Sequence, residues 1–270
     1  MARSTDRKDY QDVPRPIGAM AKDFADGHFI PPHAHERSQI IYASCGVMRV
    51  RTPQGAWVVP PHRAVWVPAG VVHDVRMAGA VAMRTLYIAP EAVRTLPAEC
   101  CVVAVSPLLR ELILRAVELP LLYDETGAEG RLMTLILDEL RALPVLPLNL
   151  PMPADPRLLR VCRAILAEPG AARALGDWAG EVGASSRTLA RGFVRETGMT
   201  FGRWRQQARL LEALTRLAQA QSVTTIALDL GYESPSAFTS MFRRALGRTP
   251  SAYFAEATGA AAVAPPPRGR

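Results

Sequence analysis

Lysine is almost missing from this chain of 270 residues: Lys8 and Lys22 are the two present, so nearly all of the 32 basic side chains are arginine. Long apolar runs are missing as well. The run over residues 100–109 stops at Arg110, well short of the roughly 18 uncharged residues that a membrane-spanning helix requires. We therefore expect no membrane partner.

Cysteine is scarce, and its spacing excludes two kinds of site. Cys45, Cys100, Cys101 and Cys162 form no CxxC pair and no disulfide-like framework. The charged N-terminal residues lack the apolar core of a secretory signal. We expect a cytoplasmic protein with reduced thiols. The apolar fraction of 49% excludes a mostly disordered chain.

The positive charge is concentrated towards the C-terminus. The whole chain carries a net charge of +7. Residues 1–156 hold 16 basic and 17 acidic side chains, whereas residues 157–256 hold 14 arginines and 8 acidic side chains. This asymmetry favours an acidic polymer, such as a nucleic acid, as the partner of the C-terminal part. A solvated arginine-rich face is the alternative.

The N-terminal part has the sequence pattern of a β-domain. Residues 1–15 are polar and contain proline, so we expect them to be disordered. Short runs rich in Val, Ile, Tyr and Trp then alternate with Gly and Pro, which favours an antiparallel barrel or sandwich. The predicted strands cover residues 39–45, 46–52, 56–60, 64–68, 73–77 and 81–88.

Helical periodicity begins after residue 105. Two helices are expected within residues 105–119 and 132–143, and they carry more apolar surface than an isolated pair can bury. They therefore pack on the barrel, on a second subunit or on both, and we slightly favour a dimer interface. Residues 144–156 contain five prolines and no periodicity, which indicates a stiff linker at a domain boundary.

The C-terminal part is expected to be entirely helical. Gly or Pro follows most of the segments that show helical spacing of apolar residues, and Ser185 is a favourable N-cap residue. The predicted helices cover residues 157–168, 174–182, 185–197, 200–219, 223–230, 234–246 and 250–254. The Ala/Pro-rich residues after 257 form a loose tail.

Two of these helical units repeat the same arrangement. A short helix, a turn at Gly183 or Gly231 and a second basic helix together match the layout of the DNA-binding helix-turn-helix. The connecting helix of about 20 residues spans about 30 Å. Major grooves recur about every 34 Å on one side of DNA. The spacing predicts two DNA-reading helices about one DNA turn apart.

The same region resembles a known family. Residues 185–198, SSRTLARGFVRETG, are similar to the first recognition helix of the AraC/XylS family of bacterial transcription regulators. Residues 227–244, ALDLGYESPSAFTSMFRR, and GRTP at 247–250 resemble the second unit of that family. The resemblance covers about the whole of residues 157–256 and includes both copies in order. It implies sequence-specific binding to promoter DNA.

The resemblance also implies which residues face the DNA. Arg187 and Arg191 would project into the first major groove, where arginine pairs with O6 and N7 of guanine. The second unit carries Pro235 and small residues, which implies weaker base reading and a grip on phosphates through Arg243 and Arg244. The full expected set is Ser186, Arg187, Arg191, Arg195, Ser236, Thr239, Ser240, Arg243 and Arg244.

Three histidines of the N-terminal part resemble the motifs of the cupin barrel. His33 and His35 form an HxH pair, and His73 ends a PxGxxH motif. By that resemblance the three are metal ligands, but Gln39 replaces the usual Glu and removes a charged ligand. The alternative is a pocket for an organic effector. The expected pocket residues are His33, His35, Gln39, Tyr42, Trp66 and His73.

The sequence thus predicts an α+β multidomain protein. We expect a cupin-like sensor barrel over residues 1–103, a dimerising helical pair over 104–143, a linker over 144–156 and a DNA-binding domain over 157–256. The expected function is transcription regulation, without enzymatic activity. We expect a homodimer that binds promoter DNA and a small-molecule effector, and RNA polymerase is a candidate partner. The alternatives are a metal-dependent cupin enzyme, for which Glu36 is the candidate carboxylate, and a non-specific architectural DNA binder.

Overall fold

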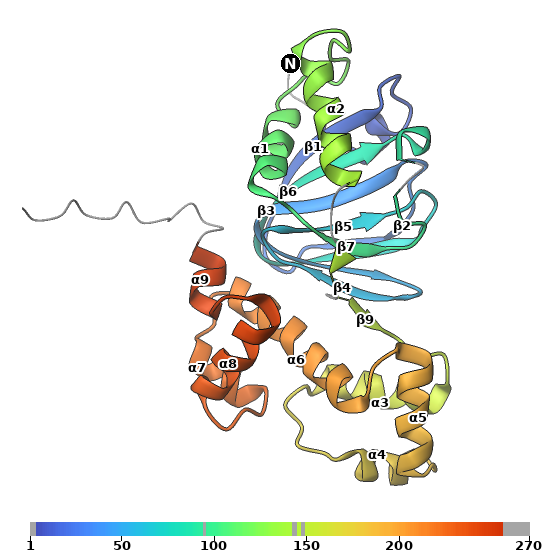
Figure 1. Cartoon of the computed structure of the whole chain (residues 1–270), viewed down its shortest axis with the longest axis vertical. Coiled ribbons are helices and arrows are strands. Elements are labelled where there is room, and N and C mark those ends of the chain that lie inside the picture. The colour runs from blue at the N-terminus through green and yellow to red at the C-terminus, as the bar shows by residue number, and fades with distance from the viewer. Residues whose placement is uncertain (1–3, 94–95, 142–144, 147–148, 256–270) are drawn as a thin grey trace, which may run out of the picture.

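The computed structural model describes residues 4–93, 96–141, 145–146 and 149–255. An antiparallel sheet forms the N-terminal part, and helices form the C-terminal part (Figure 1). The strands are β1 (Ile17–Phe24), β2 (Phe29–His33), β3 (Ser38–Thr52), β4 (Gly55–Val59), β5 (Arg63–Val67), β6 (His73–Ile88), β7 (Cys101–Ala104), β8 (Val145–Leu146) and β9 (Asn149–Pro151).

The helices agree with the predicted ones to within a few residues, except that α2 begins earlier, at Ala128. They are α1 (Pro107–Ala116), α2 (Ala128–Arg141), α3 (Pro156–Ala167), α4 (Leu175–Glu181), α5 (Ser186–Thr197), α6 (Phe201–Ala218), α7 (Val223–Asp229), α8 (Pro235–Leu246) and α9 (Pro250–Ala255). None of these helices is long and apolar enough to cross a membrane. The predicted tail after residue 257 lies outside the described residues.

The sheet depends on two long, bent strands. β3 and β6 are each continuous, although the sequence predicted each as two strands. The pairing register of β3 shifts on either side of Cys45, and Gly46 adopts a φ of +78° there. A Cβ at Gly46 would lie 2.4 Å from the carbonyl oxygen of Ala80, so glycine allows the two strands to approach at the bend.

The bend divides the sheet into two arms. The first arm has the order β1-β6-β3-β5-β7-β8, and the second has the order β2-β6-β3-β4-β9. The described strands do not close into a barrel, so the prediction of a cupin-like barrel is corrected to an open, folded sheet. Helices cover the outer faces of both arms, and the inner faces turn towards each other.

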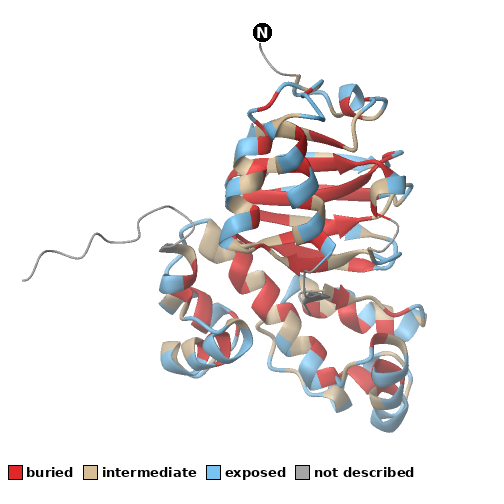
Figure 2. Ribbon diagram, turned by 45° about the horizontal axis from the view of Figure 1, so that its top comes forward, coloured by how far each residue is buried: buried red, intermediate tan, exposed pale blue. Residues whose placement is uncertain are grey.

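Helices α1 and α2 pack on the outer face of the first arm (Figures 1 and 2). Leu109 and Ile113 of α1 and Ile136 of α2 are fully buried in the same cluster as Ile40 and Tyr42 of β3. The Leu-rich stripes are therefore used largely within one chain. Leu108 and Leu135 remain 50% and 41% exposed.

The first residues of the chain are ordered where the structure describes them, so the prediction of disorder is wrong for residues 4–15. Residues Arg7–Tyr10 form a short 3₁₀ helix, and the Tyr10 ring packs against Tyr87. Arg37 is 8% exposed and donates hydrogen bonds to the backbone carbonyls of Gln11, Val13 and Arg15. This long-range anchor compensates for the low apolar content of the segment.

The proline-rich segment is part of the sheet. β8 pairs with β7, and β9 pairs with β4, so the segment predicted to be a stiff linker is paired into the sheet where the structure describes it. Both are edge strands, where a proline without an N–H is tolerated. Residues 142–144 and 147–148 lie outside the described residues.

Helix α6 connects the sheet to both helical units (Figure 1). Near its beginning, Nε1 of Trp204 donates to the carbonyl of Pro151 at 2.8 Å. In its middle, Glu212 forms an ion pair with Arg49 of β3 at 3.3 Å. Beyond its end, Gln219 donates to Asp26 in the turn between β1 and β2. The helix therefore lies along the outer face of the second arm.

The two helical units also touch each other directly. The turn after α3 lies against the end of α7, where a Cβ at Gly170 would be 2.0 Å from the carbonyl oxygen of Asp229. Arg209 of α6 donates to the carbonyl of Pro169 and lies over the ring of Tyr232. The placement of the second unit on the first therefore requires glycine at position 170.

Replacing Gly170 tests this contact. Gly170→Ala should destabilise the protein by about 1–3 kcal/mol, because the added methyl group forces the two backbones apart. Gly202→Ala is the matched control, since a Cβ there meets no atom within 4 Å and should be neutral or stabilising by up to about 1 kcal/mol. Urea unfolding curves measure both. Equal midpoints for the two variants would show that the contact is unimportant.

Candidate nucleic-acid interface and ligand cavity

The two helix-turn-helix units share the same turn. Gly183 and Gly231 have φ values of +65° and +72°. In the first unit the N–H of Ala184 donates to the carbonyl of Ala179 at 2.9 Å, and in the second unit the N–H of Tyr232 donates to that of Ala227 at 3.0 Å. Because these bonds join equivalent positions 48 residues apart, the predicted duplication is confirmed in the backbone.

The second helix of each unit is held in the same way. Ser185 caps α5 by accepting from the N–H of Thr188, and Ser234 caps α8 by accepting from that of Ala237. The inner faces of these helices are buried, at Leu189 and Phe193 in α5 and at Phe238 and Phe242 in α8. The outer faces of α5 and α8 are left to solvent.

The residues predicted to meet DNA lie on these outer faces. The side chains of Arg187 and Arg191 on α5 and of Arg243 and Arg244 on α8 are exposed, and none of the four makes a hydrogen bond or ion pair with another described residue. Arg195 is exposed but pairs with Glu196 at 2.7 Å. Of the smaller side chains, Ser186, Ser236 and Ser240 are exposed and Thr239 is half-buried. Free cationic side chains of this kind can bind phosphate oxygens or base edges.

The connection between the units is one straight helix. α6 has 18 residues, which gives a length of about 27 Å. Trp204, Ala213 and Leu214 along it are fully buried, so both units share one core with it. A packed helix of this kind holds the two outer faces at a fixed separation.

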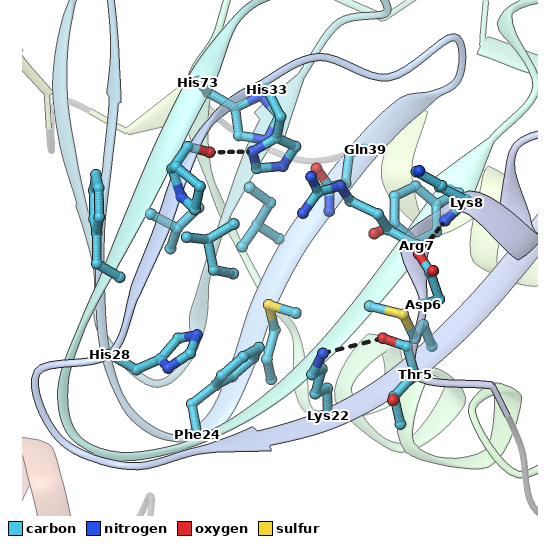
Figure 3. A pocket seen from close by; sticks show the side chains of 18 residues that line it. Thr5, Asp6, Arg7, Lys8, Lys22, Phe24, His28, His33, Gln39 and His73 are labelled. Atoms are coloured by element: carbon cyan, nitrogen blue, oxygen red, sulfur yellow. Dashed lines mark hydrogen bonds between the residues drawn. The ribbon is translucent and has the colours of Figure 1, made fainter.

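A cavity of about 590 Å³ lies between the two arms of the sheet (Figure 3). Residues from the N-terminal segment, β1, β2, β3 and β6 line it. They are Thr5, Asp6, Arg7, Lys8, Met20, Lys22, Phe24, His28, Phe29, Ile30, Pro31, His33, Gln39, Ile41, His73, Val75, Met83 and Tyr87. The volume is in the range of small-molecule pockets.

The three predicted histidines come together at the edge of this cavity, which His33 and His73 line and His35, a predicted pocket residue, does not. The ring centroids of His33 and His73 are 4.4 Å apart, and that of His35 lies 4.8 Å from His33 and 5.4 Å from His73. Nδ1 of His33 donates to the carbonyl of Pro31 at 2.7 Å, and Nδ1 of His73 donates to that of Val71 at 2.9 Å. A carbonyl oxygen can only accept, so Nδ1 holds the proton and Nε2 holds a lone pair in both rings.

Burial keeps these imidazoles neutral. Loss of hydration lowers the pKa of His33 to about 4 and that of His35 to about 3. The same burial lowers the pKa of His73. At neutral pH the cluster therefore presents lone pairs, which suit hydrogen-bond donors or a metal ion.

Gln39 offers a further acceptor to the same cavity. Its Nε2 donates to Oγ1 of Thr85 at 2.9 Å, and that hydroxyl donates to the carbonyl of Ile40. Because the only hydroxyl hydrogen of Thr85 is used, the amide cannot be turned around. Oε1 of Gln39 is therefore fixed as a buried acceptor, and it has no hydrogen-bond partner among the described residues.

Cationic side chains line another part of the cavity. Arg7, Lys8 and Lys22 border it together with one carboxylate, that of Asp6. The side chain of Arg7 extends towards Gln39 (Figure 3), and its charge is close enough to lower the pKa of all three histidines further. The cavity thus combines an excess of positive charge with apolar walls such as Met20 and Val75.

Tyr42 and Trp66 do not line this cavity, so their prediction as pocket residues is wrong. Residues alternate across a strand, and Gln39 and Ile41 face inwards while Tyr42 faces the helices. Trp66 pairs with Ile40 in the register, lies on the same outer face and donates to the carbonyl of Pro97 at 2.7 Å. Both aromatic rings belong to the core beneath α1 and α2.

Sequence reasoning missed the wall formed by the N-terminal segment. Arg7 and Lys8 were assigned to a disordered stretch, and Lys22 and Phe24 lie on β1, which was not among the predicted strands. Tyr10 was the available signal, because an aromatic residue in a polar segment indicates an anchor. Its ring is 3% exposed.

The anchor of the N-terminal segment can be tested at Arg37. Arg37→Ala leaves three backbone carbonyls without their donor and should cost about 2–4 kcal/mol of stability. Chymotrypsin should then cleave after Tyr10 well before the rest of the chain. Arg51→Ala is the control, since Arg51 is 59% exposed in a single ion pair and should cost less than about 1 kcal/mol. Unchanged protection of Tyr10 in Arg37→Ala would contradict the anchor.

Two family models match consecutive parts of the chain. Residues 20–177 match the family model of the AraC-like ligand binding domain, and residues 178–256 match that of a helix-turn-helix domain. The HTH-type transcriptional regulator NimR of Escherichia coli is 38% identical over 228 residues, which cover 84% of this chain and 83% of NimR.

Two further matches are another relative and a solved structure. The HTH-type transcriptional regulator RipA of Corynebacterium glutamicum is 33% identical over 118 residues, or 44% of this chain and 36% of RipA. The solved structure of ToxT from Vibrio cholerae with a bound unsaturated fatty acid is 11% identical, with a TM-score of 0.39 over 92% of this chain and 98% of ToxT.

Proposed function

The chain belongs to the AraC family of transcription regulators, with an N-terminal ligand-binding domain and a C-terminal helix-turn-helix domain, and from this we propose how it works. α5 and α8 enter successive major grooves of one promoter site. A small molecule in the cavity of the sheet changes how well they do so. The observation that carries the proposal is the pair of equivalent helices with free arginines on their outer faces.

The two recognition helices differ in what they offer to DNA. We propose that Arg187 and Arg191 read bases in the first groove, because both are exposed and unpaired. Arg195 and Ser186 flank them. The short side chains Ser236, Thr239 and Ser240 allow close approach of α8, while Arg243 and Arg244 bind phosphates. The length of α6 supports a separation near one DNA turn.

The DNA-binding unit begins ahead of α3 in this proposal. A Cβ at Gly192 of α5 would lie 2.8 Å from Cδ1 of Leu158, so α3 is packed tightly on the first recognition helix. Val161 and Ile165 of α3 are buried in the same core. This packing supports a DNA-binding unit that includes α3, as the boundary predicted at residue 157 has it, rather than one that begins at residue 178.

The cavity favours an effector with an anionic group and an apolar body. The charges of Arg7, Lys8 and Lys22 outnumber the single carboxylate of Asp6 in its lining. The remaining lining includes methionine, isoleucine and aromatic side chains that bury apolar surface. An anion would therefore be attracted by charge, and its body would gain affinity from burial.

The turn between β1 and β2 can couple the cavity to DNA binding. Phe24 and His28 on either side of this turn line the cavity. Between them, Asp26 accepts from the N–H of Gly79 at 2.7 Å and from Nε2 of Gln219 at 3.3 Å. An effector that favours one position of the turn would favour one position of the end of α6, which leads into the second unit.

The enzyme alternative receives no support from the cavity. Glu36, the carboxylate that the enzyme hypothesis requires, is exposed and is absent from the lining. The relatives that match are transcriptional regulators. We therefore propose a non-enzymatic cytoplasmic regulator, with RNA polymerase as its further partner at the promoter.

Two arginine variants test the DNA interface. Arg191→Ala should weaken binding to the native promoter by about 1–3 kcal/mol and relax the base preference at one or two positions. Arg243→Ala should weaken binding to all sequences and lower the slope of log K against log salt by about 1. Fluorescence anisotropy on promoter and random duplexes, repeated at several salt concentrations, measures both effects.

A variant outside the interface completes that experiment. Arg51→Ala changes an exposed arginine on β3 of the sensor domain, outside α1, α2 and the lining of the cavity between the arms, and should leave both affinity and salt slope unchanged. Full-strength promoter binding by both Arg191→Ala and Arg243→Ala would contradict the groove assignment. Equal affinity of the unaltered protein for promoter and random DNA would instead favour the non-specific binder.

We also propose that α1 and α2 form a dimer interface. Leu108 and Leu135 are exposed on helices whose other leucines are buried or half-buried, which leaves apolar surface to cover. Light scattering should then give about twice the chain mass of 29.3 kDa, and Leu135→Asp should give the monomer mass. Leu122→Asp, outside both helices and 62% exposed, is the control that should remain dimeric. A strict monomer at micromolar concentration would exclude the interface.

A further inference from the structure

A second cavity, of about 270 Å³, lies between the sheet and helix α6. Side chains of β3, β4, β6 and β9 line one side of it, and the end of α3, the turn after it and the middle of α6 line the other. Residues alternate across β6, so Val75 lines the cavity between the arms while Arg76 lines this one. The two cavities therefore lie on opposite faces of the second arm, and we call the second one the interdomain cavity.

Positive charge gathers on the sheet side of the interdomain cavity. Arg49 of β3 lies directly opposite Arg76 of β6 in the strand register. Like charges at directly opposite positions of neighbouring strands destabilise a sheet. Arg51, two residues further along β3, is already matched by Asp74 at 3.0 Å. Arg49 and Arg76 are therefore the two cations that require a counter-charge.

The described residues supply only part of that counter-charge. Oε2 of Glu212 lies 3.3 Å from Nη1 of Arg49, which is longer than the roughly 2.7–2.9 Å typical of such pairs. The same carboxylate also pairs with Arg216, at 3.0 Å. Arg76 makes no hydrogen bond or ion pair with another described residue, and its guanidinium carbon lies 5.0 Å from the centroid of the Phe29 ring. One shared carboxylate therefore faces two guanidinium groups.

We propose that the interdomain cavity binds a phosphate group, free or as a small monoester, between Arg49 and Arg76. A guanidinium group donates two parallel hydrogen bonds to phosphate oxygens. A phosphate monoester carries a charge of about −1.5 to −2 at neutral pH, which matches the two arginines better than the single charge of a carboxylate does. Apolar side chains such as Val58 and Leu211 line the rest of the cavity and contact a short apolar group of the monoester.

Binding exchanges one partner of Arg49 for another. The phosphate takes the place of Glu212, which keeps its contact with Arg216 on the same helix. Because Arg49 belongs to the sheet and Glu212 to α6, the exchange removes an ion pair that joins the two. The effect of this exchange on promoter binding rests on the proposed function, whereas phosphate binding itself does not.

Calorimetric titration of the full chain with inorganic phosphate and with glycerol 3-phosphate tests the site. At least one of the two should bind with a dissociation constant of about 1 mM or lower, and the tighter of them identifies the free ion or the monoester as the ligand. Arg76→Ala should lower the affinity by about tenfold or more, since it removes a charged donor. Arg203→Ala is the matched control, because Arg203 is an exposed arginine of α6 outside the lining and should bind as the unaltered protein does.

A further variant gives a gain rather than a loss. Glu212→Gln removes the carboxylate that competes with the ligand for Arg49, and it should raise the phosphate affinity by about fivefold or more. A misfolded protein would not show this gain. Because Arg76 is exposed, Arg76→Ala leaves the core intact, and circular dichroism of each variant checks the fold.

Three results would overturn the phosphate site. They are the absence of binding by both probes, equal affinity of Arg76→Ala and Arg203→Ala, and binding of acetate as tightly as of phosphate. Promoter affinity at matched ionic strength reports the DNA-binding proposal separately. Phosphate should change the promoter affinity of the unaltered protein by about fivefold or more and leave that of Arg76→Ala unchanged.

The outcomes separate this proposal from the proposed function. Phosphate binding without any effect on the promoter would reject the exchange at α6 alone. Phosphate binding by a protein that does not recognise its promoter would reject the groove assignment alone.

Discussion

The contact between helix α6 and the sheet is the constraint on which the rest of this structure depends. The helix fixes the separation of α5 and α8, and it also lies on the outer face of the second sheet arm. A continuous row of ion pairs runs from β3 across α6 to α7 and consists of Arg49, Glu212, Arg216 and Asp229. A movement of the sheet therefore reaches the second helix-turn-helix unit through packed elements rather than through a free linker.

The folded sheet gives one small domain both surfaces on which helices pack and a cavity. Each arm has an outer face for helices and an inner face for the cavity, and the alternation of side chains along β3 and β6 assigns residues to one or the other. Gln39 and Tyr87 therefore line the cavity, while Ile40 and Leu86 pack beneath α1 and α2. A shift of one residue in the register would exchange these roles, so the bulges near Gly46 also protect the binding site.

Much of the helical part could be predicted from the sequence because its signals are local. Ser185 and Gly198 mark the ends of α5 directly, and the 48-residue repeat is visible in the letters. The N-terminal part was harder because its determinants are distant in sequence. Arg37 binds carbonyls 22 to 26 residues away, and Tyr10 packs on Tyr87, so the polar composition of the first segment was misleading. The motifs pick out the three histidines that the structure brings together, whereas the side of the sheet on which Tyr42 lies depends on the strand register.

The position of the first ordered residues has a practical consequence for handling the protein. Thr5 and Asp6 already border the cavity, so anything fused ahead of them begins at its edge. A polyhistidine purification tag attached there would bring six additional imidazoles to the edge of a cavity where three histidines already gather. Crystals or binding data from such material would describe the tag as much as the sensor. A fusion at the other end of the chain, beyond α9, avoids placing foreign ligands at that edge.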